Sequence, residues 1–207
     1  KGCVRQHSQE LAALGTKALL VTGKHSSRVN GSLQDVEDAL NREQVPYVVF
    51  DGIEENPSVA TVMRATALGL SEKVDFVIGI GGGSPMDASK AIALMIANPE
   101  KKADFLYETD AAVKQAANKA LPVAAVPTTA GTGSEVTPYA ILTNHEKQTK
   151  KSIASPCLFP TYALLDAKYT KNLGLATTVN TAIDSLSHSV EGDRKSTRLN
   201  SSHESIS

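Results

Sequence analysis

The stretch DFVIGIGGGSPMDASKA, residues 75–91, decides the fold. Its first six residues, DFVIGI, are dominated by an apolar run of the kind that forms a strand buried on both faces of a parallel sheet. The glycines at positions 81–83 permit a tight turn and a close approach of the backbone to a ligand. Residues 84–96 then repeat apolar side chains at helical spacing. The sequence therefore predicts a strand, a glycine-rich turn and a helix in succession.

The start of this helix has the features of an anion site. Ser84 is a good N-cap, Pro85 suits the first helical position, and Asp87 falls at the third. A helix N-terminus presents unpaired N–H donors and a partial positive charge, which favour a phosphate. The glycines are not spaced as GxGxxG, so a turn that binds no ligand explains the same residues.

Strand-like and helix-like segments alternate on both sides of this stretch. The alternation is typical of βαβ units, and it predicts an α/β fold with a mostly parallel sheet covered by helices on both faces. Such sheets bind ligands at the carboxyl ends of their strands. The predicted strands are residues 17–22, 47–50, 75–80, 121–126 and 163–165, and the predicted helices are residues 33–43, 59–70 and 84–96.

A second polar loop follows the fourth predicted strand. Residues 127–135 (PTTAGTGSE) place three threonines, one serine and two glycines within nine positions. Their hydroxyls and backbone N–H groups can hydrogen-bond pyrophosphate or ribose oxygens. A loop that only caps its own turns fits the residues equally well. Because two such loops follow strands of one parallel sheet, together they favour a nucleotide.

Asp184 and His188 form a candidate metal pair. They lie four positions apart in NTAIDSLSHSVE, residues 180–191. On a helix this spacing puts both side chains on one face, about 5–6 Å apart at Cβ. A carboxylate and an imidazole can share a divalent metal. A hydrogen-bonded surface pair is the alternative, and two ligands alone cannot complete a metal site.

Charge and composition exclude several classes of protein. The net charge of −1 gives no basic balance for nucleic acid or an anionic membrane. Aromatic residues make up 4% of the chain, which disfavours a stacking surface for single strands. No apolar run is long enough to span a bilayer. Cys3 and Cys157 are interpreted as two reduced thiols, which indicates a reducing compartment such as the cytoplasm. From these observations together, we expect a cytoplasmic protein without nucleic-acid or membrane partners.

The pattern of the chain changes after residue 172. Residues 1–172 are predicted to form an α/β nucleotide-binding domain, and residues 173–192 the start of an all-helical domain. Residues 193–207 lack hydrophobic periodicity and are predicted to be disordered. Because residues 193–203 closely resemble the translation of a sequencing-library adapter, we expect a non-native tail on a fragment that is incomplete at both ends.

Three motifs carry a resemblance to a known family. GGGSPMDASKA (residues 81–91), PTTAGTGSEVTPYAILTN (127–144) and TAIDSLSHSVEG (181–192) resemble the signatures of iron-containing, or group III, alcohol dehydrogenases. The resemblance covers residues 1–192. It implies a Rossmann-like parallel sheet domain followed by the start of an all-helical metal-binding domain, an architecture shared with dehydroquinate synthase.

The resemblance also implies a chemistry. The expected protein is an oxidoreductase that transfers a hydride between an alcohol and NAD(P), or in reverse from NAD(P)H to an aldehyde or ketone. Fe²⁺, or Zn²⁺ in its place, polarises the substrate oxygen as a Lewis acid. The cofactor carries the hydride chemistry, so no catalytic side chain is assigned. A small alcohol or aldehyde is the expected partner, with a homo-oligomer at full length.

Carried over position by position, the resemblance implies two sets of site residues. Asp184 and His188 would be the first two metal ligands, and two histidines of the family lie beyond residue 192. The glycine turn would hold pyrophosphate, the threonines would contact phosphate, ribose or nicotinamide, and Lys150, or its neighbour Lys151, would lie near a ribose. The expected cofactor-binding residues are Gly23, Asn56, Gly82, Gly83, Ser84, Thr128, Thr129, Thr132 and Lys150.

Gly23 is the informative departure from the family pattern. Many NAD-dependent members have an aspartate there, at the end of the first strand, which binds the adenosine ribose hydroxyls. Without this carboxylate a 2′-phosphate is not repelled, and Lys24, Arg28 or the serines between them can bind it. We therefore expect NADP to be preferred over NAD. Leu173-Gly174, where the family usually has Leu-Pro, carries no functional prediction.

Two other interpretations stay open. The first is a neighbour on the same fold, namely a glycerol dehydrogenase, a maleylacetate reductase or a dehydroquinate synthase-like enzyme. The second is that the 207-residue chain is an inactive cofactor-binding fragment with half a metal site.

Overall fold

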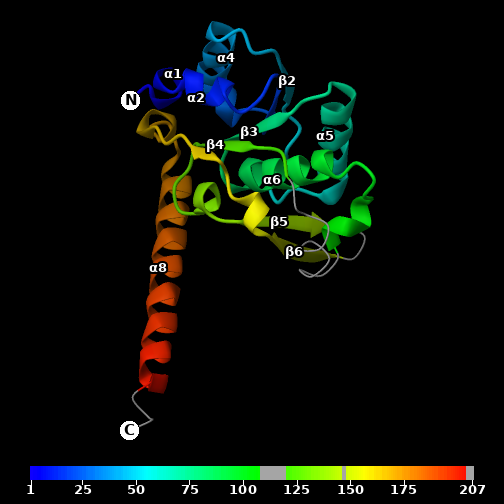
Figure 1. Cartoon of the computed structure of the whole chain (residues 1–207). Coiled ribbons are helices and arrows are strands. Elements are labelled where there is room, and N and C mark those ends of the chain that lie inside the picture. The colour runs from blue at the N-terminus through cyan, green and yellow to red at the C-terminus, as the bar shows by residue number, and fades with distance from the viewer. Residues whose placement is uncertain (108–119, 146–147, 204–207) are drawn as a thin grey trace.

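The chain is organised around one parallel sheet. The computed structural model describes residues 1–107, 120–145 and 148–203, with side chains as far as Asp193. Five strands, all parallel, form the sheet in the order β2-β1-β3-β4-β7, which confirms the predicted α/β fold (Figure 1). The strands are β1 (Ala18–Thr22), β2 (Tyr47–Phe50), β3 (Phe76–Gly81), β4 (Val123–Pro127) and β7 (Tyr162–Ala163).

Both faces of this sheet are buried. Leu19 and Val21 of β1 pack into a cluster with α5 (Val59–Ser71) and α6 (Gly83–Ala97). Their neighbours Ala18 and Leu20 point to the opposite face, where they join a cluster built on α4 (Ser32–Arg42). Since successive side chains of a strand alternate between faces, burial on both sides explains the unbroken apolar runs in the sequence.

The strand order places a natural ligand crevice at one edge of the sheet. The chain passes from β1 to β2 on one side and then returns to β3 on the other side of β1. At such a reversal the connecting segments leave in opposite directions and open a crevice beyond the carboxyl ends of the strands. The glycine turn follows β3 at this edge. The shorter helices are α1 (Cys3–Gln6), α2 (Ser8–Ala12), α3 (Ser26–Val29), η1 (Ala103–Tyr107), η2 (Ser134–Val136), η3 (Pro156–Leu158) and η4 (Ala167–Thr170).

A hairpin that was not predicted from the sequence is formed by two antiparallel strands, β5 (Tyr139–Asn144) and β6 (Thr149–Ala154). In β5 the even-numbered positions are buried, while Tyr139 and Ile141 are each 50% exposed. Apolar residues on both faces hide the usual alternation of a half-buried strand. Helix α6 lies between the sheet and this hairpin (Figure 1).

The predicted N-cap of α6 was wrong by two positions. Gly82 is the N-cap, and Ser84 lies inside the first turn. The Ser84 hydroxyl accepts a hydrogen bond from Asn56 N at 3.1 Å instead of capping the helix. The preceding Gly81 has a φ of +148°, where an added Cβ would lie 2.6 Å from Pro85 Cγ. Because of the glycine turn, the helix begins two residues earlier than the N-cap preference of serine indicated.

Helix α8 (Leu175–His203) projects away from the rest of the molecule (Figure 1). Residues 193–203, predicted to be disordered, continue this helix. A helix that is already nucleated extends at little cost, which explains why polar residues can prolong it. Their non-native origin and the proposed domain limits stay predictions. None of the described helices combines the length and apolar character that a bilayer crossing requires.

Candidate functional site

The motifs from distant parts of the sequence meet around one cavity of about 810 Å³. The start of α6, the threonine loop, the β5–β6 hairpin and α8 each contribute to its wall. Its size is within the range of pockets that hold small molecules and cofactors. The lining residues are Asn56, Pro57, Gly83, Ser84, Asp87, Gly131, Thr132, Gly133, Ser134, Thr137, Tyr139, Ile141, Thr143, Lys150, Ser152, Asp184 and His188.

The glycine turn and the threonine loop are in close contact. A Cβ on Gly82 would lie 3.1 Å from Thr129 Oγ1, and a Cβ on Gly83 would lie 3.1 Å from Thr132 Cγ2. Side chains at either glycine would fill the space between the two loops. Thr128 N also donates to Gly81 O at 2.8 Å, so the loops are joined through their backbones. This narrow, donor-rich cradle suits a phosphate group.

Asn56 connects the α6 start to the hairpin. Its backbone is left-handed, with a φ of 55°, a conformation that asparagine tolerates better than most residues. Its N–H donates to the Ser84 hydroxyl, and its Oδ1 accepts a hydrogen bond from Lys150 Nζ at 2.8 Å. The structure thus brings together three predicted cofactor-binding residues that are far apart in the sequence.

Lys90 and Asp87, one turn apart on α6, hold the opposite wall of the cavity. The side chain of Lys90 is fully buried and donates to Ser134 Oγ, Thr137 O and Tyr139 O at 2.8–2.9 Å. Asp87 accepts from Ser134 Oγ at 2.5 Å and from the backbone N–H of Ile141 at 3.0 Å. These bonds attach the segment between the threonine loop and β5 to the helix.

Burial shifts the pKa values of both charged groups in this network. Burial lowers the pKa of Lys90 to about 8, although the nearby carboxyls of Asp87 and Glu135 oppose the shift. Burial also raises the pKa of Asp87, against the hydrogen bonds from Ser134 and Ile141 and the charge of Lys90. Desolvation disfavours the charged form of each group, which explains the opposite directions of the two shifts.

Asp184 and His188 line the same cavity from α8. His188 Nε2 lies 3.5 Å from Asp184 Oδ1, and both side chains are about half exposed. The threonine loop approaches this helix closely, because a Cβ on Gly131 would lie 2.5 Å from Thr181 O. The predicted metal pair therefore faces the predicted nucleotide loops across one cavity.

Several predicted residues lie behind the cavity wall. Thr128 is buried, Thr129 and Gly82 pack against each other, and none of the three lines the cavity. Gly23 lies at the end of β1, where a Cβ would be 3.3 Å from Ile53 O. Their binding roles stay predictions.

Residues that act through tertiary contacts were not predicted from the sequence. No binding role was predicted for Asp87, Lys90 or Thr143. For Asp87 and Lys90 the available signal was a pair of charges three positions apart in an otherwise uncharged helix, residues 83–97. A charged pair embedded in such a helix has to find buried partners.

One orphaned atom tests whether a polar ligand fits. Thr143 Oγ1 is the buried side-chain oxygen for which the described residues provide no hydrogen-bond partner. Buried hydroxyls nearly always have one, and Thr143 lines the cavity beside its cross-strand neighbour Lys150. The orphaned hydroxyl and the glycine cradle both fit a nucleotide.

The described residues have only some of the side chains that a metal site requires. Asp184 and His188 have the chemistry and spacing of two ligands, but the described residues contain no group of three or more metal-binding side chains. A closed site requires four ligands and a catalytic one three. Metal binding by this pair stays a prediction, because the described residues provide two candidate ligands and no third.

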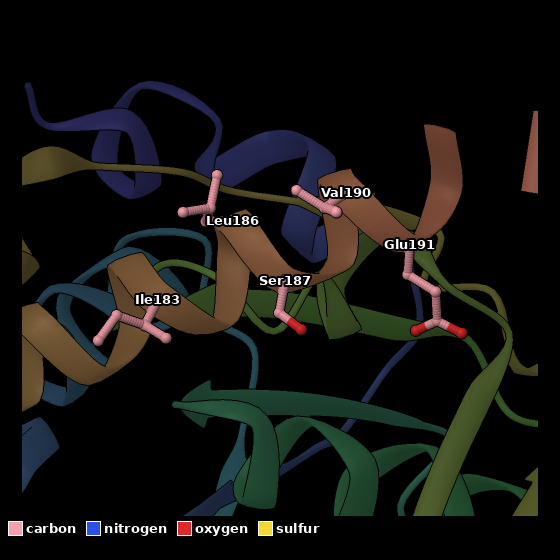
Figure 2. Close-up of a pocket in the computed structure, with 5 residues that line it drawn as sticks. All are labelled: Ile183, Leu186, Ser187, Val190 and Glu191. Carbon is pink, nitrogen blue, oxygen red and sulfur yellow. The ribbon is translucent and has the colours of Figure 1, made fainter. Parts of the chain in front are cut away.

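The outer face of α8 is apolar and uncovered. Figure 2 shows Ile183, Leu186 and Val190 on successive turns of the helix, around a shallow hollow of about 500 Å³. These side chains are between 52% and 63% exposed. A contiguous apolar stripe is typical of a surface that packs against another structural unit.

The parallel sheet, its covering helices and the loops at one edge define a Rossmann-like α/β domain. The chain belongs to the iron-containing alcohol dehydrogenase family, whose model matches residues 1–167. This confirms the resemblance seen in the three motifs.

Individual relatives agree with the family assignment. The chain is 36% identical over 194 residues to a long-chain primary alcohol dehydrogenase of Thermoanaerobacter ethanolicus, covering 92% of the chain and 48% of the relative. It is 32% identical to an NADPH-dependent butanol dehydrogenase of Clostridium saccharobutylicum, covering 86% of the chain and 45% of the relative. The solved iron-containing alcohol dehydrogenase of Thermotoga maritima superposes with a TM-score of 0.85 at 42% identity, covering 93% and 51%. The chain thus spans about half the length of these relatives.

Proposed function

We propose that this chain is the cofactor-binding part of an oxidoreductase that moves a hydride between an alcohol and NAD(P). The observation that carries the proposal is the single cavity where the glycine turn, the threonine loop and the Asp184–His188 pair meet. The reaction requires a dinucleotide and a metal-polarised oxygen at one place. Family membership supports the same activity.

The residues of the chain serve binding and orientation. Backbone N–H groups at the start of α6 and the threonine loop bind the pyrophosphate, and Lys150 and Asn56 bind a ribose at the hairpin. The hydroxyl of Thr143 gains its missing partner from the nucleotide. Together these contacts fix the nicotinamide in the cavity, and alignment of the two reactants is the main contribution of the protein.

The metal would be held by Asp184 and His188 together with ligands outside the described residues. When bound, a divalent ion such as Fe²⁺ or Zn²⁺ supplies Lewis-acid polarisation of the substrate oxygen. With two ligands the 207-residue chain binds nucleotide without sustained turnover. This proposal retains the fragment interpretation alongside the family activity.

NADP is the preferred cofactor in this proposal. Gly23 places no carboxylate at the end of β1, while the exposed Lys24 and Ser26 follow it directly. Ser27 is an unsuitable phosphate ligand because it is buried and accepts a hydrogen bond from Thr22 Oγ1. Arg28 Nη2 lies 2.9 Å from Asp51 Oδ2, so it must leave this pair to bind a phosphate.

Nucleotide binding by the 207-residue chain tests the proposal directly. Titration of NADPH, followed by its fluorescence, should show saturable binding that ADP-ribose competes for. Absence of binding at millimolar nucleotide would refute it. For activity, residues 1–192 can replace the matched part of the Thermotoga maritima relative, since the two superpose closely. The chimera should oxidise primary alcohols with NADP when loaded with Fe²⁺ or Zn²⁺.

A further inference from the structure

Lys90 is a fully buried lysine to which the proposed chemistry gives no role. It lies in the middle of α6, with its side chain 0% exposed. Burying an ammonium is costly unless each of its donors has a partner. Lys90 does not line the cavity itself, but its three hydrogen-bond partners, Ser134, Thr137 and Tyr139, do.

The hydrogen-bond acceptors of Lys90 all belong to one stretch of chain. Its three N–H groups reach Ser134 Oγ, Thr137 O and Tyr139 O, and Asp87 Oδ1 lies 3.9 Å away. Residues 134–141 lead from the threonine loop into β5, and four of them line the cavity. A lysine ammonium has three donors, so these acceptors saturate it.

Asp87 completes the attachment on the cavity side. Its two carboxyl oxygens accept from the Ser134 hydroxyl and from the backbone N–H of Ile141. Both ends of the 134–141 segment are therefore bound to α6 by charged groups that lie one helical turn apart. Side-chain bonds to the backbone fix the position of this wall.

We propose that Lys90 is a positioning residue that fixes residues 134–141 against α6 and thereby sets the shape of the nucleotide cavity. The inference rests on the proposed nucleotide binding for its functional consequence. It requires the ammonium form, because a neutral amine donates only two hydrogen bonds and leaves one of the three acceptors unpaired. The carboxyls of Asp87 and Glu135 are the charged groups that face Lys90.

The consequence for binding is a dependence on pH. Burial lowers the pKa of Lys90 to about 8, so the third hydrogen bond is lost as the pH rises through that value. NADPH affinity of the wild-type chain should fall about threefold to tenfold between pH 7 and pH 9.5. In Lys90→Met, affinity should already be reduced at pH 7 and should not change over this range. Lys171→Met, which removes an exposed lysine, should retain the wild-type profile.

Two further measurements keep the inference testable if Lys90→Met is poorly folded. Ser134→Ala retains the lysine but removes one acceptor, and it should weaken NADPH binding at pH 7. Hydrogen–deuterium exchange without nucleotide should show faster exchange at residues 134–141 in both variants, with the sheet amides unchanged. Wild-type-like exchange and binding in Lys90→Met would overturn the role of Lys90 and leave nucleotide binding intact. Failure of the wild type to bind NADPH would instead refute the proposed function, and the exchange data would still decide whether Lys90 fixes the segment.

Discussion

Lys150 Nζ donates a hydrogen bond to Asn56 Oδ1 at 2.8 Å, although 94 positions separate the two residues. The bond joins the loop after β2 to the hairpin across the rim of the cavity. Both residues line that cavity. A nucleotide that occupies it meets a lysine already oriented by its partner.

Lys150→Met should weaken NADPH binding about tenfold, because a charge-assisted hydrogen bond to the ligand is worth about 1.4 kcal/mol or more. Titration by NADPH fluorescence checks this. The matched control is Lys151→Met, since the adjacent residue is not among those that line the cavity. A larger loss of NADPH affinity in the Lys151 variant would show that Lys151, and not Lys150, contacts the nucleotide.

Gly23→Asp should reverse the cofactor preference. The wild-type chain should bind NADP⁺ more tightly than NAD⁺. A carboxylate at the end of β1 should repel the 2′-phosphate and thereby lower the affinity for NADP⁺ by about tenfold or more. Calorimetry with both nucleotides measures the ratio. Gly23→Ala adds the Cβ near Ile53 O without the charge and should keep the wild-type preference. Tighter binding of NAD⁺ than of NADP⁺ by the wild type would contradict the proposed preference for NADP.

Metal binding should be weak. Two ligands provide roughly half of a four-ligand structural site, whose free energy is about 10–16 kcal/mol, so a dissociation constant of roughly micromolar or weaker is expected. Calorimetry with Zn²⁺ and metal analysis after gel filtration measure this. His188→Ala should remove the binding, whereas His145→Ala should not. Stoichiometric metal that survives gel filtration would show that the site is complete.

The stability of the fold should respond to the titration of Lys90. Its folded-state pKa of about 8 lies below the ordinary value of 10.5, so the unfolded chain holds more protons between these values. The free energy of unfolding of the wild type, relative to Lys90→Met, should therefore rise with pH across that window, by at most about 1.4 kcal/mol per pH unit. Chemical denaturation at pH 7.5 and pH 10 tests the sign. A difference that falls with pH would contradict the lowered pKa.

Thr143→Val should stabilise the empty chain. The substitution keeps the shape and removes a buried hydroxyl that lacks a partner among the described residues, which should raise the free energy of unfolding by about 1 kcal/mol. Thr66→Val is the control, because the Thr66 hydroxyl donates to Val62 O at 2.9 Å, and its removal should give no gain. Equal or lower stability of the Thr143 variant, measured by urea denaturation, would show that the oxygen is satisfied in solution.

The sheet could be predicted because its strands carry a strong local signal. Positions 18–21 and 76–80 are apolar without interruption, and burial on both faces requires that composition. The β5–β6 hairpin lacked such a signal, since Tyr139 and Ile141 face the cavity and β6 is largely polar. Its conformation depends on α6, which is a tertiary contact.

The loops of the site could be predicted from their position after strands, but the network behind them could not. Lys90 acts through Thr137 O and Tyr139 O, and no residue type marks a backbone carbonyl as an acceptor. Likewise, Ser84 has the preference of an N-cap, but its hydroxyl binds the backbone of Asn56, which arrives from another loop. Local preference fails where a distant segment offers a competing partner.

The close approach of Gly131 to Thr181 O has a thermodynamic consequence. At this point the backbone of the threonine loop lies directly against the backbone of the helix that carries Asp184 and His188, because Gly131 has no side chain to separate them. A dinucleotide that shifts the loop must shift the helix as well. Cooperativity between two such sites is reciprocal, so a nucleotide that tightens metal binding is itself bound more tightly, by the same factor, when the metal is present.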